Sequence, residues 1–264
     1  MNRIEKRLND LKNQNKKAFI TYITAGFPDL EKTKAIIKAQ EEAGTDIVEM
    51  GIPFSDPIAD GPVIQQASYE AILNGASLRK IFKCLQEMRD GGLQLPIVFM
   101  MYYNTIVHYG IKEFVAKCHE TGVDGIIVPD LPFEEQDNLL NELGDDDRTI
   151  LIQLVSPISG KRVPMILENA RGFVYCVSSM GVTGQSADFH KEVINYLKYV
   201  KENSKVPVMM GFGIRTAADV EPMKDIIDGA IVGTHFINLL RDSNFDENKA
   251  AEYSRTFKEK LNRM

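Results

Sequence analysis

Hydrophobic residues along the chain gather in short runs that recur at regular intervals. Eight of these runs are rich in Val, Ile and Phe and have the length of a strand. Runs that are apolar on both faces are typical of a parallel sheet, which is covered on both sides. The predicted strands are residues 18–24, 46–50, 96–101, 124–128, 149–154, 173–177, 207–210 and 229–233.

Longer segments between these runs repeat their apolar positions every three or four residues, as amphipathic helices do. They are LEKTKAIIKAQEEA, VIQQASYEAIL with SLRKIFKCLQEM, IKEFVAKCHE, FEEQDNLLNEL, KEVINYLKYVKE and ADVEPMKDII, together with both chain ends. A weak internal repeat supports this pattern, because a helix end, a turn containing Asp and an apolar strand follow one another three times. Its copies are EEAGTDIVEMG, HETGVDGIIVP and KDIIDGAIVGT.

Eight strand–helix units within this length predict an α/β fold, a single (β/α)8 TIM barrel with an extra N-terminal helix. We expect residues 1–264 to form one domain, because no linker or change of composition divides the chain. A doubly wound open sheet is the alternative. It is disfavoured because no GxGxxG motif follows the first strand.

The composition narrows the class of partner. There are 31 basic and 37 acidic residues, for a net charge of −6, which argues against non-specific binding to nucleic acid or to an anionic membrane. The three cysteines form no CxxC pair, and we interpret them as free thiols in a reducing compartment. The charged N-terminal segment does not resemble a signal peptide, so a cytoplasmic location is expected.

Three carboxylates stand within VEMGIPFSDPIADG, around the end of the second predicted strand. In a barrel, active sites form at the carboxyl ends of the strands. Glu49 shares a strand face with Ile47; if that face lines the barrel, burial should raise its pKa and suit it to acid/base catalysis. A strand-end acid paired with a cation explains Glu49 equally well. Asp60 could cap the next helix, and Asp56 is most simply a turn residue.

Glycines recur in the last three predicted loops: Gly181 and Gly184, Gly211 and Gly213, and Gly233 followed by Thr234. Glycines let a backbone approach a ligand closely, and the start of a helix binds anions. Each glycine alone is explained by a tight turn, but three neighbouring loops together favour a phosphate site. A small phosphorylated substrate is therefore expected.

Other chemistry is disfavoured. No lysine lies in a predicted strand to form a Schiff base. The four histidines lack metal-ligand spacing, so we expect no metal. Metal-free acid/base chemistry remains. Several side chains at strand ends could form an apolar or aromatic wall, although core packing is their usual role; they are Tyr22, Met100, Ile127, Tyr175 and Phe212.

VEMGIPFSDPIADG closely resembles the signature of the tryptophan synthase alpha chain family. Further motifs follow in that family's order: AFITYITAGFPD, MMYYNTIVHYG, GVDGIIVPDLP, FVYCVSSMGVTG, GFGI and GAIVGT. The resemblance implies a retro-aldol cleavage of indole-3-glycerol phosphate to indole and glyceraldehyde 3-phosphate. It also implies an α2β2 heterotetramer with a beta chain that carries pyridoxal phosphate and receives the indole, and no cofactor in this chain.

The resemblance also implies a role for each matching residue. Glu49 protonates indole C3 and accepts the proton of the glycerol hydroxyl, and Asp60 accepts a hydrogen bond from the indole N–H. The matching indole pocket is Tyr22, Met100, Ile127, Tyr175 and Phe212, with Thr183 closing a loop over Asp60. The matching phosphate positions are Gly184, Gly213, Gly233 and Thr234, and the matching interface positions are Asp56 and Asn104.

Some positions depart from the family pattern. Thr234 stands where Ser is usual and His235 where Ala is common, both beside the expected phosphate. Ser179 and Met180 precede GVTG where some members have an arginine, and Phe133 replaces a proline on the surface used against the partner. Two alternatives stay open: a subunit that mainly binds and activates the beta chain, and a free-standing lyase. Retention of the interface positions disfavours the second.

Overall fold

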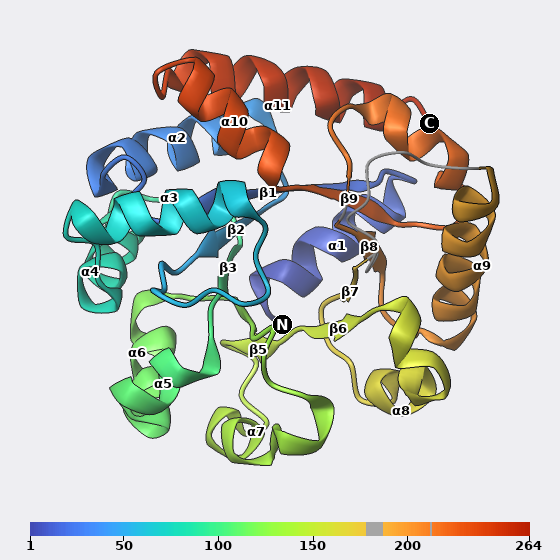
Figure 1. The fold of residues 1–264 in the computed structure, drawn as a ribbon, viewed down its shortest axis with the longest axis horizontal. Helices are drawn as coiled ribbons and strands as arrows, with labels where there is room; N and C mark the ends of the chain where they lie inside the picture. The colour runs from blue at the N-terminus through green and yellow to red at the C-terminus, as the bar shows by residue number, and fades with distance from the viewer. Residues whose placement is uncertain (178–186, 212) are drawn as a thin grey trace.

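The computed structural model describes residues 1–177, 187–211 and 213–264. All described strand pairs are parallel, in the order β5-β4-β3-β2-β1-β9-β8-β7-β6 (Figure 1). The strands are β1 Ala18–Thr24, β2 Ile47–Gly51, β3 Ile97–Met100, β4 Gly125–Ile127, β5 Ile150–Leu151, β6 Gln153–Val155, β7 Val174–Cys176, β8 Val208–Met210 and β9 Gly229–Val232.

The fifth predicted strand closes the sheet into a barrel. Its first half, β5, pairs with β4, and its second half, β6, pairs with β7. Only Ile152 separates the halves, and its backbone N–H donates to the carbonyl oxygen of Ile126 at 2.9 Å. The eight predicted strand segments therefore form the strands of a TIM barrel, and the predicted fold is confirmed.

Helices surround the barrel on its outside, except for α1, which lies across one end (Figure 1). The α-helices are α1 Arg3–Asn13, α2 Leu30–Ala43, α3 Pro62–Leu73, α4 Leu78–Asp90, α5 Tyr103–Tyr109, α6 Ile111–Thr121, α7 Asp137–Leu143, α8 Val163–Leu167, α9 Ala187–Asn203, α10 Thr234–Asp242 and α11 Glu247–Leu261. The described residues also contain three short 3-10 helices: η1 Phe133–Glu135, η2 Pro157–Arg162 and η3 Ala217–Met223.

Three helical elements differ from the prediction. Residues 103–109 were expected to be loop but form α5, and α8 was not predicted. Both are too short to show a helical period. Residues 218–227 were expected to be an amphipathic helix, but residues 217–223 form η3, because Pro222 lies inside the segment and cannot donate an α-helical hydrogen bond.

The predicted N-terminal helix closes one end of the barrel. Ile4, Leu8 and Leu11 of α1 pack into the cluster that fills the barrel interior. Asn2 caps α1, and its amide nitrogen Nδ2 donates to the carbonyl oxygens of Asp124 and Arg148. Asp124 lies just before β4, so α1 covers the amino ends of the strands and leaves the carboxyl ends open to a ligand.

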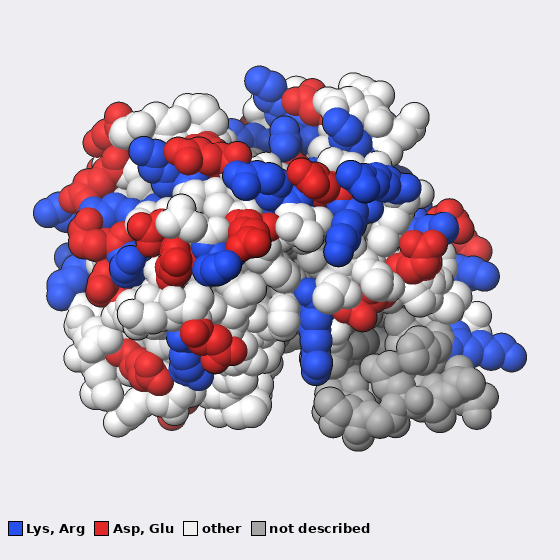
Figure 2. Space-filling view, turned by 90° about the horizontal axis from the view of Figure 1, so that it is seen from above, with Lys and Arg blue, Asp and Glu red and all other residues white. Residues whose placement is uncertain are grey.

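Charged side chains of both signs are interspersed on the face seen in Figure 2. None of the helices described in the structure is long and apolar enough to cross a membrane.

Candidate active site

The carboxyl group of Glu49 lies inside the barrel. Glu49 is the third residue of β2 and stands in register with Tyr22 of β1 and Val98 of β3. It shares a strand face with Ile47, which belongs to the interior cluster. The side chain is fully buried, with 0% of its surface exposed. The predicted orientation of this strand face is confirmed.

The surroundings of Glu49 favour the protonated acid. Neither carboxylate oxygen has a hydrogen-bond partner within the described residues. Burial raises the pKa of Glu49 to about 8, because the charged form loses its hydration. The alternative of a strand-end acid paired with a cation is not supported by the described contacts. A carboxyl group with such a pKa can give and accept protons near neutral pH.

Tyr22 and Tyr175 flank this acid. The ring of Tyr175 lies so close to Gly211 that a Cβ atom there would collide with it, and the Tyr175 hydroxyl donates to the Gly211 carbonyl oxygen at 3.4 Å. Burial raises the pKa of both tyrosines, and the charges of Glu49 and Asp60 raise it further. The two tyrosines and the two acids therefore interact electrostatically within one site.

Asp60 is held by a residue that the sequence did not single out. The hydroxyl of Tyr102 donates to Oδ2 of Asp60 at 2.9 Å and accepts from the backbone N–H of Ala59 at 2.9 Å. Tyr102 also stacks on Phe54, with ring centroids 5.1 Å apart. The only signal for Tyr102 in the sequence was its place directly after the third apolar run. Burial raises the pKa of Asp60, and the Tyr102 hydrogen bond opposes that rise.

The expectation that Asp60 caps a helix is wrong. Helix α3 begins after Gly61, which makes no side-chain cap, and Pro62 occupies its first turn. The Asp60 carboxylate instead accepts from Tyr102, on the opposite side of the loop. The Asp60 side chain thus does not cap α3, and Asp60 is only half-buried.

Two of the side chains expected in the apolar wall lie in or against the interior cluster. Ile127 is the buried last residue of β4 and belongs to the interior cluster. Met100, the last residue of β3, is half-buried and contacts both this cluster and the one that contains Tyr22. Phe212 and Thr183 lie outside the described residues.

Two of the three expected phosphate loops are described. Gly213 is exposed and adopts φ +71°, a conformation that favours glycine. Gly233 precedes α10 without a side-chain cap, and Thr234 is the exposed first residue of that helix. The first N–H groups of a helix lack intrahelical partners and attract anions. Gly184, in the third loop, lies outside the described residues.

The comparisons with known proteins decide the family. Residues 8–264 match the family model described as the tryptophan synthase alpha chain. The chain belongs to this family.

Individual relatives agree with this assignment. The chain is 63% identical over 263 residues to the tryptophan synthase alpha chain of Lachnospira eligens, covering 99% of this chain and 100% of that one. It is 45% identical over 240 residues to the alpha chain of a Thermoanaerobacter species, covering 91% of each. The crystal structure of tryptophan synthase subunit alpha from Legionella pneumophila has a TM-score of 0.90 at 32% identity and covers all of both chains.

The expected interface positions of the alpha chain family lie on the surface. Asp56, in the loop after β2, and Asn104, in the first turn of α5, are both exposed. Three large apolar side chains missed by the sequence analysis are also exposed in segments that follow strands: Ile58 at 83%, Val107 at 52% and Ile158 at 86%.

Two of the departures from the alpha chain pattern can be placed. Phe133 begins η1 and packs, half-buried, against the outer core. His235 is half-buried in the first turn of α10, and its ring lies 5.5 Å from that of Tyr253. Ser179 and Met180 lie outside the described residues.

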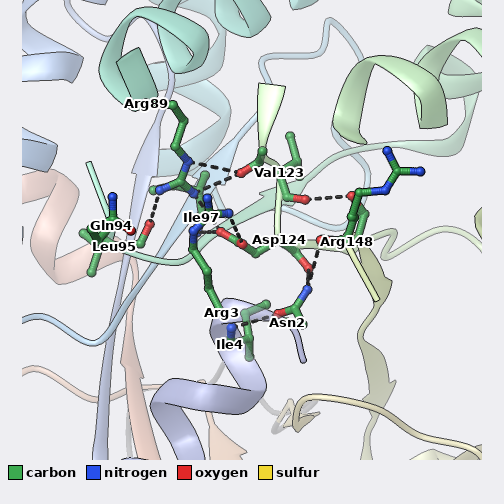
Figure 3. Close-up of polar contacts among 12 residues, drawn as sticks. Asn2, Arg3, Ile4, Arg89, Gln94, Leu95, Ile97, Val123, Asp124 and Arg148 are labelled. Carbon is green, nitrogen blue, oxygen red and sulfur yellow. Dashed lines mark hydrogen bonds and ion pairs between the residues drawn. The ribbon is translucent and has the colours of Figure 1, made fainter. Parts of the chain in front are cut away.

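A cavity of about 570 Å³ lies at the other end of the barrel, lined by Arg3, Arg89, His119, Asp124 and Arg148 among others. Figure 3 shows that Arg3 and Arg89 bind the Asp124 carboxylate and that Arg89 also donates to nearby backbone carbonyls. In the part of the chain that the structure describes, no group of three or more His, Cys, Asp or Glu residues could hold a metal ion.

Proposed function

We propose that the chain is a carbon–carbon lyase that cleaves indole-3-glycerol phosphate to indole and glyceraldehyde 3-phosphate. Membership of the tryptophan synthase alpha chain family supports this reaction. The observation that carries it is Glu49, a fully buried carboxyl group without a described hydrogen-bond partner at the open end of the barrel.

The reaction needs one proton at indole C3 and the loss of one proton from the glycerol hydroxyl. Burial keeps Glu49 protonated near neutral pH, so it can deliver the proton to C3. The bond from C3 to the glycerol carbon then breaks as the hydroxyl oxygen becomes the aldehyde oxygen. The Glu49 carboxylate formed in the first step accepts the hydroxyl proton, and the enzyme returns to its starting state.

Protonation at C3 places positive charge on the indole ring nitrogen. Asp60 is the second acid of the site, and its hydrogen bond from Tyr102 favours the ionised form. An ionised carboxylate that accepts the indole N–H stabilises this charge as it develops. Tyr22, Met100, Ile127 and Tyr175 form the apolar wall against the ring. Phe212 and Thr183 keep the pocket roles that the resemblance implies.

The phosphate binds at the loops that carry Gly213, Gly233 and Thr234, with Gly184 from a third loop. Support comes from the open backbone at Gly213 and the uncapped start of α10. Uncapped N–H groups bind phosphate without a basic surface, in keeping with a net charge of −6.

We further propose that a beta chain binds this subunit in an α2β2 heterotetramer and receives the indole. Tryptophan synthase structures from M. tuberculosis are among the similar structures, one with a TM-score of 0.87 at 28% identity. The exposed side chains of Ile58, Val107 and Ile158 fit a docking surface at the open end of the barrel. Pyridoxal phosphate belongs to the beta chain, and two carboxylates suffice for the proton transfers in this chain. The three buried free cysteines fit a cytoplasmic location.

The Glu49→Gln variant tests the reaction. It should lose indole release by at least about 100-fold, because a glutamine neither gives nor accepts the proton. Binding of substrate should be largely kept, since the shape of the side chain is unchanged. Near-normal turnover of Glu49→Gln, measured as indole released from indole-3-glycerol phosphate, would sink the mechanism.

The same assay with and without a beta chain separates the remaining alternatives. Cleavage that the beta chain accelerates supports the lyase subunit. No cleavage in either condition would leave a chain that only binds and activates its partner. Full cleavage without any response to the beta chain would identify a free-standing lyase.

A further inference from the structure

Arg215 lies next to both described phosphate loops. It follows Gly213 by two residues in the loop after β8, and its side chain is exposed. No ion pair of Arg215 is found within the described residues. Its own backbone N–H donates to Oδ2 of Asp219 at 3.0 Å, so the loop is anchored through its backbone.

Tyr253 of α11 joins the two loops. Its hydroxyl donates to the carbonyl oxygen of Arg215 at 2.6 Å. Its ring packs 5.5 Å from the ring of His235 and 5.7 Å from that of Phe236, both in the first turn of α10. One side chain therefore fixes the Arg215 backbone relative to the start of α10.

The charge of Arg215 reaches the start of α10. Burial lowers the pKa of His235, the positive charge of Arg215 lowers it further, and Asp219 opposes both. The described groups that face His235 are thus Arg215 and Asp219 from the η3 side and Tyr253 from α11. Through Tyr253, the loop that carries Gly213 and Arg215 is therefore joined to the uncapped start of α10, where Thr234 is exposed.

We propose that Arg215 supplies the side-chain cation of the phosphate subsite, with Tyr253 as the residue that positions it. The inference rests on the proposed function, which places the substrate phosphate at these loops. Backbone N–H groups alone are neutral donors, whereas a guanidinium gives charge-assisted, bidentate hydrogen bonds to a phosphate. Arg215 then selects a phosphorylated substrate over the uncharged alcohol.

Glycerol 3-phosphate, titrated calorimetrically into the isolated chain, tests this role without any need for cleavage. Arg215→Gln should weaken its binding roughly tenfold, the effect of losing one charge-assisted contact. Arg263→Gln is the matched control, because it removes the same charge at the far end of α11. That end lies at the amino ends of the strands, where Lys258 pairs with Asp46. It should bind as the unchanged chain does.

Two further measurements separate a direct role from a structural one. Tyr253→Phe keeps the ring beside His235 but loses the bond to the Arg215 carbonyl, so it should weaken binding by less than Arg215→Gln. The His235 pKa, followed by NMR, should rise in Arg215→Gln because a neighbouring positive charge is gone, and it should rise on ligand binding in the unchanged chain.

Equal binding of glycerol 3-phosphate by Arg215→Gln and the unchanged chain would overturn the inference, as would an unchanged chain that does not bind it. Failure of the proposed function looks different: indole-3-glycerol phosphate is not cleaved, while glycerol 3-phosphate still binds through Arg215.

Discussion

The burial of Glu49 suits it to acid/base catalysis but lowers the stability of the folded chain when the carboxyl group ionises. A buried carboxyl group without a described partner is stable only while it is protonated, since an unpaired buried charge is unfavourable. The same burial gives it a pKa of about 8. Catalytic groups are often destabilising for this reason.

This cost predicts a pH-dependent effect of Glu49→Gln on stability. The folded-state pKa of about 8 lies above the unfolded value of about 4.3, so the folded chain binds the extra proton between them. The contribution of Glu49 to the free energy of unfolding is therefore full below pH 4 and falls as the pH rises through 8. At pH 9, the free energy of unfolding of Glu49→Gln should exceed that of the unchanged chain by on the order of 4 kcal/mol.

Urea unfolding at pH 5 and pH 9 measures this difference. The gain from the substitution should be much larger at pH 9 than at pH 5. A gain that does not depend on pH would mean that Glu49 ionises normally in the folded chain.

The hydrogen bond from Tyr102 to Asp60 leads to a second prediction, about the pH dependence of the reaction. Its hydroxyl donates to Oδ2 of Asp60, which lowers the pKa of Asp60 against the rise from burial. Tyr102→Phe removes the donor, so the Asp60 pKa should rise and the acid limb of the pH–rate profile should move to higher pH. We expect kcat to fall about tenfold through loss of about 1–2 kcal/mol of orientation and charge stabilisation.

The position of the acid limb distinguishes this role from general damage. In Asp60→Asn, that limb should be absent, and adding Tyr102→Phe should lower kcat little further. Additive losses in the double variant would show that Tyr102 acts independently of Asp60.

At the scale of elements, the strands were predictable and several helices were not. Each strand is a short apolar run buried on both sides, which its residue types reveal. The five residues of α8 and the seven of α5 are too few to show a period, and their helical form depends on packing. The bond from Tyr102 to Asp60 joins residues 42 positions apart, so only the barrel geometry brings them together.

The site was predictable to the same extent. The place of Glu49 on its strand followed from alternation, whereas its lack of a partner needed the packed interior. Asp60 was identified as an acid near the site, but its role as a cap was wrong because loop geometry determines which group it meets.

At the end of the barrel that α1 covers, we expect the buried ion pair of Asp124 to contribute to the stability of the chain. Asp124 is buried between two arginines: Arg89, whose side chain is 8% exposed, and Arg3, at 42% (Figure 3). Arg89 also donates to the carbonyl oxygens of Leu93 and Leu95. Arg89→Met leaves Asp124 and both carbonyls without their buried donor and should lower the free energy of unfolding by about 3 kcal/mol.

Arg3→Met is the matched comparison, because it removes the exposed partner of the same carboxylate. Its cost in urea unfolding should be below about 1 kcal/mol, as for other exposed pairs. Equal losses from the two substitutions would contradict the assignment of Arg89 as the main partner of Asp124.

At the scale of the whole molecule, the barrel divides its tasks between its ends. The amino ends of the strands are closed by α1 and the Asp124 cluster, whereas the carboxyl ends hold the acids and the exposed loops (Figure 1). At the carboxyl ends, Tyr102 links the site to the expected docking surface, because it directly precedes α5, which carries the exposed Asn104, and also donates to Asp60. A partner docked on α5 would therefore act on the position of a reacting group.

Ile58 tests the docking surface. Its side chain is 83% exposed, so Ile58→Asp should leave the melting temperature of the isolated chain nearly unchanged. A carboxylate placed in an apolar interface is desolvated without a partner, and binding of a beta chain should weaken at least about tenfold.

Tyr199→Asp is the control, since Tyr199 is also exposed but lies two residues from Lys201, which pairs with Asp228 at the amino end of β9. Calorimetry with a beta chain should show normal binding for Tyr199→Asp; equal weakening by both variants, or by neither, would contradict the specific role of Ile58 in the docking surface.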